Sequence, residues 1–134
     1  MKKILAALLI AAPLVAQAPV KWEENLDAAL VRAKAEHKAV FLDLWAEWCG
    51  PCQKLKKDTF PSAQGAAALA KVVATSVMVE TRDRTPNPHG MALAERFQLE
   101  AFPTLLMVDE NGKELRRHVG YLAPAEFARF VEGK

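Results

Sequence analysis

Two cysteines separated by a glycine and a proline are the residues with the clearest capacity for chemistry. Cys49, Gly50, Pro51 and Cys52 directly follow the apolar residues 40–45 and a short connection. This order predicts a buried strand, a turn at the glycine and proline, and a helix that starts at the cysteines. Unpaired N–H groups and the helix dipole favour a thiolate at such a helix start. Cys49 is therefore the expected nucleophile of thiol–disulfide exchange, with Cys52 as the resolving thiol.

A carboxylate interrupts the same apolar run. Asp43 stands between Leu42 and Leu44. A solvated position at the end of the strand is one interpretation, but the apolar neighbours favour a buried side chain beneath the cysteines. Burial raises the pKa of a carboxyl group, which would let Asp43 exchange protons with Cys52.

The cysteine pair could also form a structural disulfide or bind a metal ion. A disulfide that closes so small a ring stabilises a fold by only about 2 kcal/mol, against more than about 4 kcal/mol for a loop near 100 residues. Structural zinc needs four ligands, and His37, His89 and His118 are not spaced as ligands. Binding of Cu(I) by the two sulfurs stays open, with Met91 or Met107 as the candidate third ligand.

The segment around the cysteines, residues 43–52 with the sequence DLWAEWCGPC, resembles the active-site segment of thioredoxins. Residues 101–104, AFPT, are similar to the segment that carries the cis-proline of that family. Gly120 stands where thioredoxins have a glycine that lines the substrate groove. The chain from residue 40 onward also resembles the C-terminal periplasmic domain of transmembrane disulfide-reductant conductors.

This resemblance implies an α/β, thioredoxin-like fold: a central mixed β-sheet with helices on both faces. It implies proton transfer by Asp43, a cis bond before Pro103, and a redox-active disulfide between Cys49 and Cys52, with no metal or other cofactor. The residues expected to contact an extended peptide substrate are Trp48, Gly50, Pro51, Phe102, Pro103 and Gly120.

The start of the chain has the pattern of an export signal. Lys2 and Lys3 precede the apolar residues 4–15, and residues 16–18 read AQA. This pattern predicts a secretory signal peptide at residues 1–18, since the apolar run is short for a membrane span of about 20 residues. Pro19 is an unfavourable residue after the expected cleavage site, so an uncleaved anchor that tethers the protein to a membrane is the alternative.

The remainder of the chain, residues 19–134, is predicted to form one thioredoxin-like domain. About 116 residues suffice for a compact domain with its own core, and we expect it to act as a monomer. Without Lys2 and Lys3 the formal net charge falls from +2 to zero. The charge therefore gives no support to nucleic-acid binding.

Apolar periodicity and turn residues predict the remaining elements. Trp22 is expected to be the first inward-facing residue of a helix, and Met91 to face inward from another. Residues 82–90 read as a long polar loop, and an Asn-Gly turn predicts a hairpin between the last two strands. The predicted helices cover residues 22–34, 52–60, 63–71 and 91–97 and the chain from residue 124 onward, and the predicted strands cover residues 40–45, 72–81, 104–108 and 113–119.

These features together predict an exported thiol–disulfide oxidoreductase that reduces protein disulfides. The reducing direction follows from the resemblance of Gly50-Pro51 to the reducing members of the family. In an oxidising compartment such a protein needs a source of electrons, so the expected partners are disulfide-bonded proteins and a membrane thiol relay. The alternative is a thioredoxin-fold assembly factor that binds copper or delivers thiols without general turnover.

Overall fold

The computed structural model of the 134-residue chain describes residues 11–12 and 18–134. The expected signal peptide, residues 1–18, falls almost entirely outside these residues. Among the helices of the described part, none combines the length and the apolar character that a membrane span requires.

A four-stranded mixed sheet with the order β2-β1-β3-β4 forms the centre of the molecule. The strands are β1 (Val40–Ala46), β2 (Val73–Glu80), β3 (Thr104–Val108) and β4 (Glu114–Val119). β1 pairs in parallel with β2 and antiparallel with β3, which forms the predicted hairpin with β4. The central place of β1 explains its continuous apolar sequence, because both of its faces are covered.

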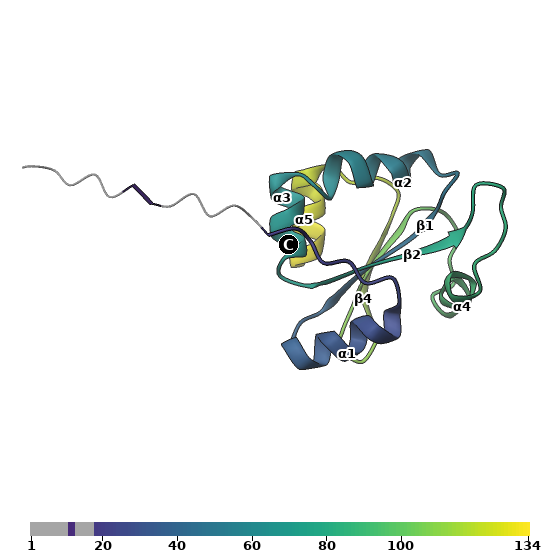
Figure 1. Ribbon diagram of the computed structural model, residues 1–134, viewed down its shortest axis with the longest axis horizontal. Coiled ribbons are helices and arrows are strands. Elements are labelled where there is room, and N and C mark those ends of the chain that lie inside the picture. The colour runs from purple at the N-terminus through teal and green to yellow at the C-terminus, as the bar shows by residue number, and fades with distance from the viewer. Residues whose placement is uncertain (1–10, 13–17) are drawn as a thin grey trace, which may run out of the picture.

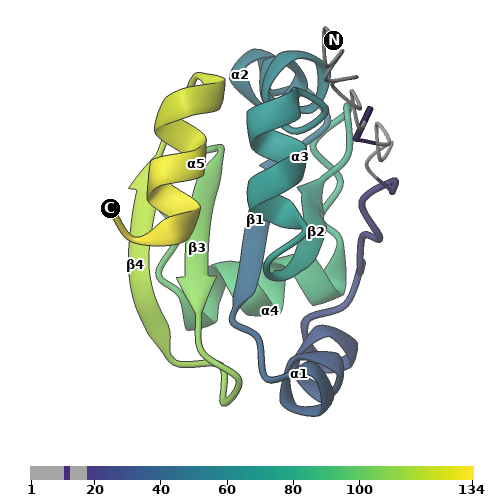
Figure 2. The same cartoon turned by 90° about the vertical axis from the view of Figure 1, so that its left-hand side faces the viewer.

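Helices cover both faces of the sheet, as Figures 1 and 2 show. One layer holds α1 (Leu26–Glu36) and α4 (Pro88–Arg96); the other holds α2 (Gly50–Lys54), the π-helical turn η1 (Leu55–Thr59), α3 (Ala63–Leu69) and α5 (Pro124–Glu132). Side chains alternate along β1, so Leu42 and Leu44 face α1 while Phe41 packs under α5. By the same alternation Asp43 faces the layer that contains α2. The predicted α/β fold with helices on both faces is confirmed.

The prediction that the first helix begins near Trp22 is wrong. α1 begins at Leu26, because the side chain of Asn25 accepts a hydrogen bond from the first turn and caps the helix. Trp22 lies in an extended segment before this cap. Its ring packs against Phe41 and Phe60, in the layer opposite to α1. The helical spacing of Trp22 is therefore coincidental.

The predicted polar loop is shorter at its end than expected. α4 begins at Pro88, since the side chain of Asn87 accepts hydrogen bonds from the next two N–H groups of the helix. Met91, expected to face inward, is 41% exposed. Leu93 and Phe97 instead cover the sheet from this helix.

Candidate active site

Cys49 and Cys52 form a disulfide where the chain leaves β1 and enters α2, with their Cα atoms 5.3 Å apart. Cys49 is the N-cap residue of α2, and its sulfur accepts a hydrogen bond of 3.2 Å from the backbone N–H of Cys52. The prediction that a helix starts at the cysteines is confirmed. The predicted turn at Gly50 and Pro51 is wrong, because both residues belong to the first turn of α2 and the turn precedes them at residues 47–48. In the reduced protein the same N–H and the helix dipole would stabilise a thiolate on Cys49.

Both cysteines are buried, Cys52 slightly more than Cys49. Cys49 is 3% exposed and Cys52 is 1% exposed. They form a small apolar cluster against which Trp45 and Phe102 pack. A substrate that reaches the sulfur of Cys49 must therefore come close to Phe102.

Asp43 is buried in the middle of the sheet, with 1% of its surface exposed. Ser76, its partner in β2, donates a hydrogen bond of 3.2 Å from Oγ to Oδ2 of Asp43. The other oxygen, Oδ1, has no hydrogen-bond partner among the described residues. Burial raises the pKa of Asp43 to about 7, although the charge of Lys56 and the bond from Ser76 act in the opposite direction. The expected burial of Asp43 is confirmed, and its part in proton transfer stays a prediction.

The residues expected to form a substrate groove lie at the same end of the sheet as the disulfide. The Phe102–Pro103 peptide bond is cis, as the resemblance implied. The carbonyl of Pro103 accepts a hydrogen bond of 2.9 Å from the N–H of Gly120, which adopts a φ of 102° that favours glycine. Phe102 meets Trp48 edge to face, with the ring centres 5.6 Å apart. Trp48, Phe102, Pro103 and Gly120 are called the groove residues below.

The indole ring of Trp48 is held by the segment that follows β2. Its Nε1 donates a hydrogen bond of 2.8 Å to Glu80, and the guanidinium of Arg84 lies 4.5 Å from the ring centre. Close by, the backbone N–H of Arg82 donates to the carboxylate of Glu47 at 2.7 Å. Sequence reasoning missed these contacts, because they join residues more than 30 positions apart and have no local signal.

Gly50 and Pro51, also expected to contact a substrate, are exposed beside the disulfide. Pro51 occupies the first turn of α2, where its missing N–H costs no hydrogen bond. A Cβ atom added at Gly50 would have no atom within 4 Å. The surface next to the sulfurs is therefore open at these two residues.

Lys56 of η1 reaches toward the sheet beside the redox site, a position that the sequence analysis did not single out. Its ammonium nitrogen lies 2.7 Å from the centre of the Trp45 ring, and the side chain is partly buried. The spacing of Lys56 from Cys52 in the sequence could have indicated that its side chain lies near the redox site. Lys56 follows Cys52 by four residues, a spacing that places both on one side of a helix.

Among the described residues, no group of three or more histidine, cysteine, aspartate or glutamate side chains gathers as possible metal ligands. Met91 lies on α4 and outside the apolar cluster of the two cysteines. Met107 pairs with Phe41 across the sheet. Phe41 lies five residues before Ala46, the last residue of β1, so Met107 is about 16 Å from the end of β1 that leads to the cysteines. Met107 is therefore too distant to be a third sulfur ligand of the cysteine pair.

Known proteins resemble this chain in both sequence and structure. The family described as thioredoxin-like domain matches residues 26–133. The thiol:disulfide interchange protein DsbD of Pseudoalteromonas atlantica is 33% identical over 111 residues, which cover 81% of this chain and 18% of DsbD. The chain thus spans about a fifth of the length of the curated relatives it matches.

Two solved structures show the same similarity in three dimensions. A thioredoxin from Thermus thermophilus has a TM-score of 0.71 at 27% identity, over 85% of both chains. The oxidised C-terminal domain of DsbD from Neisseria meningitidis has a TM-score of 0.68 at 25% identity, over 81% of this chain and 91% of that domain.

Proposed function

The chain belongs to the thioredoxin-like domain family, and we propose that it reduces disulfide bonds of proteins outside the cytoplasm. The observation that carries this proposal is the pairing of a disulfide at the start of α2 with a buried carboxyl group on the same face of the sheet. The relatives named thiol:disulfide interchange proteins support the same chemistry.

The reaction is an exchange of disulfide bonds in two steps. The thiolate of Cys49 attacks a disulfide of the substrate, forms a mixed disulfide, and releases the second substrate sulfur as a thiolate. Cys52 then attacks the sulfur of Cys49, which releases the substrate and leaves the Cys49–Cys52 disulfide seen in the structure. Asp43 accepts the proton that Cys52 loses in this step. The substrate gains two electrons and the cysteine pair loses two.

The direction and the setting of the reaction rest on other features. Gly50-Pro51 between the cysteines resembles the reducing members of the family, and the pattern of residues 1–18 supports export. A reductase in an oxidising compartment must be reduced again after each turnover. We therefore propose a membrane thiol relay as the electron donor, protein disulfides as substrates, and a monomer that needs no further cofactor.

Reduction of insulin disulfides by the full chain, in the presence of dithiothreitol, tests this function. The wild type is expected to accelerate insulin precipitation, and the Cys49→Ser variant to give only the background rate. An inactive wild type that takes up one equivalent of Cu(I) would contradict the proposal and support the copper-binding assembly factor instead.

Replacement of Asp43 by alanine is expected to slow the second step about 100-fold and the first step much less, because only the second requires a proton acceptor for Cys52. Ellman's reagent separates the two steps: the reduced protein releases one thionitrobenzoate when Cys49 attacks and a second when Cys52 resolves the mixed disulfide. Unchanged release of the second equivalent would show that Asp43 does not accept this proton.

Replacement of Trp48 by alanine is expected to raise KM for insulin about tenfold with a smaller change in kcat, since the indole would lose its contact with substrate, worth about 1.4 kcal/mol. Trp48 is 39% exposed next to Phe102. Leu115→Ala is the matched control, because Leu115 is 51% exposed on the edge strand β4. Equal KM values for both variants would remove Trp48 from the groove.

A further inference from the structure

A cavity of about 980 Å³ lies beside the redox site, between η1, the β2 edge of the sheet and the extended segment before α1. Its walls include Trp22, Trp45, Phe60, Lys56 and Ser76. None of the groove residues contributes to its lining. The cavity is therefore a second hollow, distinct from the expected path of the substrate.

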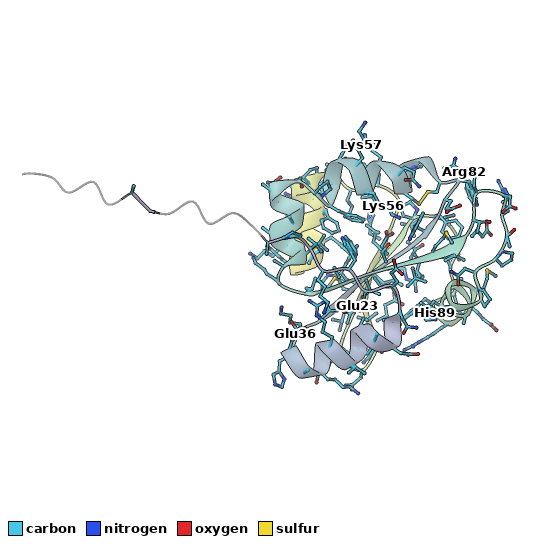
Figure 3. The ribbon with its side chains drawn as sticks, viewed as in Figure 1. Glu23, Glu36, Lys56, Lys57, Arg82 and His89 are labelled. Atoms are coloured by element: carbon cyan, nitrogen blue, oxygen red, sulfur yellow. A yellow bond between two sulfur atoms is a disulfide. The ribbon has the colours of Figure 1, made fainter. Side chains whose placement is uncertain are left out.

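Lys56 brings a positive charge to this cavity. Figure 3 shows its side chain directed from the helix toward the sheet, whereas that of Lys57 is directed outward. Partial burial lowers the pKa of Lys56 to about 8, against the opposite effects of the Asp43 and Glu47 charges. The amine is thus still mostly protonated at neutral pH.

The side chain of Ser76 connects the cavity to Asp43. Ser76, which lines the cavity, is the residue that donates to Oδ2 of Asp43, and Oδ1 lacks a hydrogen-bond partner within the described part of the chain. Other ionisable side chains of the wall are Glu47, after β1, and Glu24, from the extended segment. Among the described residues that line the cavity, Lys56 from η1 is the only cation.

We propose that Lys56 is a positioning residue of the redox site, whose ammonium group acts on Asp43 from this cavity and increases the fraction of the carboxylate that is ionised and can accept the proton of Cys52. The inference rests on the proposed role of Asp43. A nearby positive charge lowers the free energy of the ionised carboxylate, which burial otherwise disfavours. Lys56 therefore affects the resolution of the mixed disulfide and leaves its formation unchanged.

The test compares Lys56→Met with Lys57→Met in the full chain. Carbon-13 NMR of the aspartate carboxyl groups follows the ionisation of Asp43 in the oxidised protein. Lys56→Met is expected to raise the pKa of Asp43 by about one unit, which lowers its ionised fraction at pH 7 about fivefold. The release of the second thionitrobenzoate should slow about fivefold at pH 7, with the first release unchanged.

Two further variants complete the design. Lys56→Arg keeps the charge and is expected to behave nearly as the wild type, while Lys57→Met should match the wild type in both measurements. Lys56→Gln replaces the methionine variant if that variant does not fold. An unshifted titration of Asp43 in the neutral variants would overturn the proposal, as would equal shifts from Lys56 and Lys57, which would indicate only a general field.

The Asp43→Ala variant distinguishes an error in the proposed role of Asp43 from an error in the proposed role of Lys56. If Asp43→Ala resolves the mixed disulfide at the wild-type rate, Asp43 has no part in proton transfer, and Lys56 cannot act through it. If Asp43→Ala is slow but Lys56→Met is not, the proposed function stands and the inference about Lys56 is wrong.

Discussion

Replacement of Cys49 by serine is expected to abolish insulin reduction, whereas replacement of Cys52 by serine is expected to convert the protein into a covalent trap for its substrates. A serine hydroxyl is not ionised near neutral pH and cannot replace the thiolate of Cys49. In the Cys52→Ser variant Cys49 can still attack, but the mixed disulfide has no internal thiol to resolve it. Covalent complexes should rise from undetectable to a major fraction of the protein.

Cells that produce the Cys52→Ser variant allow this to be measured. The complexes are expected on non-reducing gels, to disappear with dithiothreitol, and to yield the attached proteins by mass spectrometry. The double variant Cys49→Ser, Cys52→Ser is the control and should form none. Complexes that persist in the double variant, or none in Cys52→Ser, would contradict the assignment of Cys49 as the attacking thiol.

The free energy of unfolding of the wild type is expected to fall between about pH 4 and pH 7, and replacement of Asp43 by asparagine is expected to abolish this fall. The pKa of Asp43 is about 7 in the folded protein, against 3.8 as its ordinary value. Across this interval the folded state holds the proton and the unfolded chain does not, so the free energy of unfolding falls as the pH rises. The total is about 4 kcal/mol, at about 1.4 kcal/mol per pH unit, and the loss is complete above pH 7.

Urea unfolding of the oxidised protein at successive pH values gives this curve. The asparagine keeps the size of Asp43 and an oxygen that can accept from Ser76, but it does not titrate. Asp58→Asn is the matched control, because Asp58 is exposed on η1. The titration of Lys56 lies higher, between about 8 and its ordinary 10.5, and does not enter this interval. Parallel curves for the wild type and Asp43→Asn would show that Asp43 is not neutral in the folded protein at pH 5.

Local patterns in the sequence predicted much of the fold. The unbroken apolar run of β1 indicated a central strand, and the leucines on either side of Asp43 indicated that Asp43 is buried. The place of Trp22 could not be predicted in the same way. Helical spacing cannot reveal that Asn25 caps α1 or that the segment before it pairs with β2 through Glu23.

The walls of the site were less predictable than the cysteines. Trp48 is positioned by Glu80 and Arg84, which are distant in sequence and come close only because β2 lies next to β1. Lys56 lies among three lysines that look alike in composition, and only its spacing from Cys52 distinguishes it. Residues whose place depends on such long-range packing follow from the fold and not from periodicity.

The cavity that contains Lys56 shares no lining residue with the groove. A protein partner seated over Trp48 and Pro103 would therefore leave Lys56 in contact with bulk water. Below pH 7 Lys56 stays protonated, whereas Asp43, whose pKa is about 7, gains a proton and can no longer accept the proton of Cys52. We therefore expect the lifetime of the covalent complex to increase as the surrounding compartment becomes more acidic, even while the sulfurs are covered. Acidification would then prolong the engagement of a partner that is already bound.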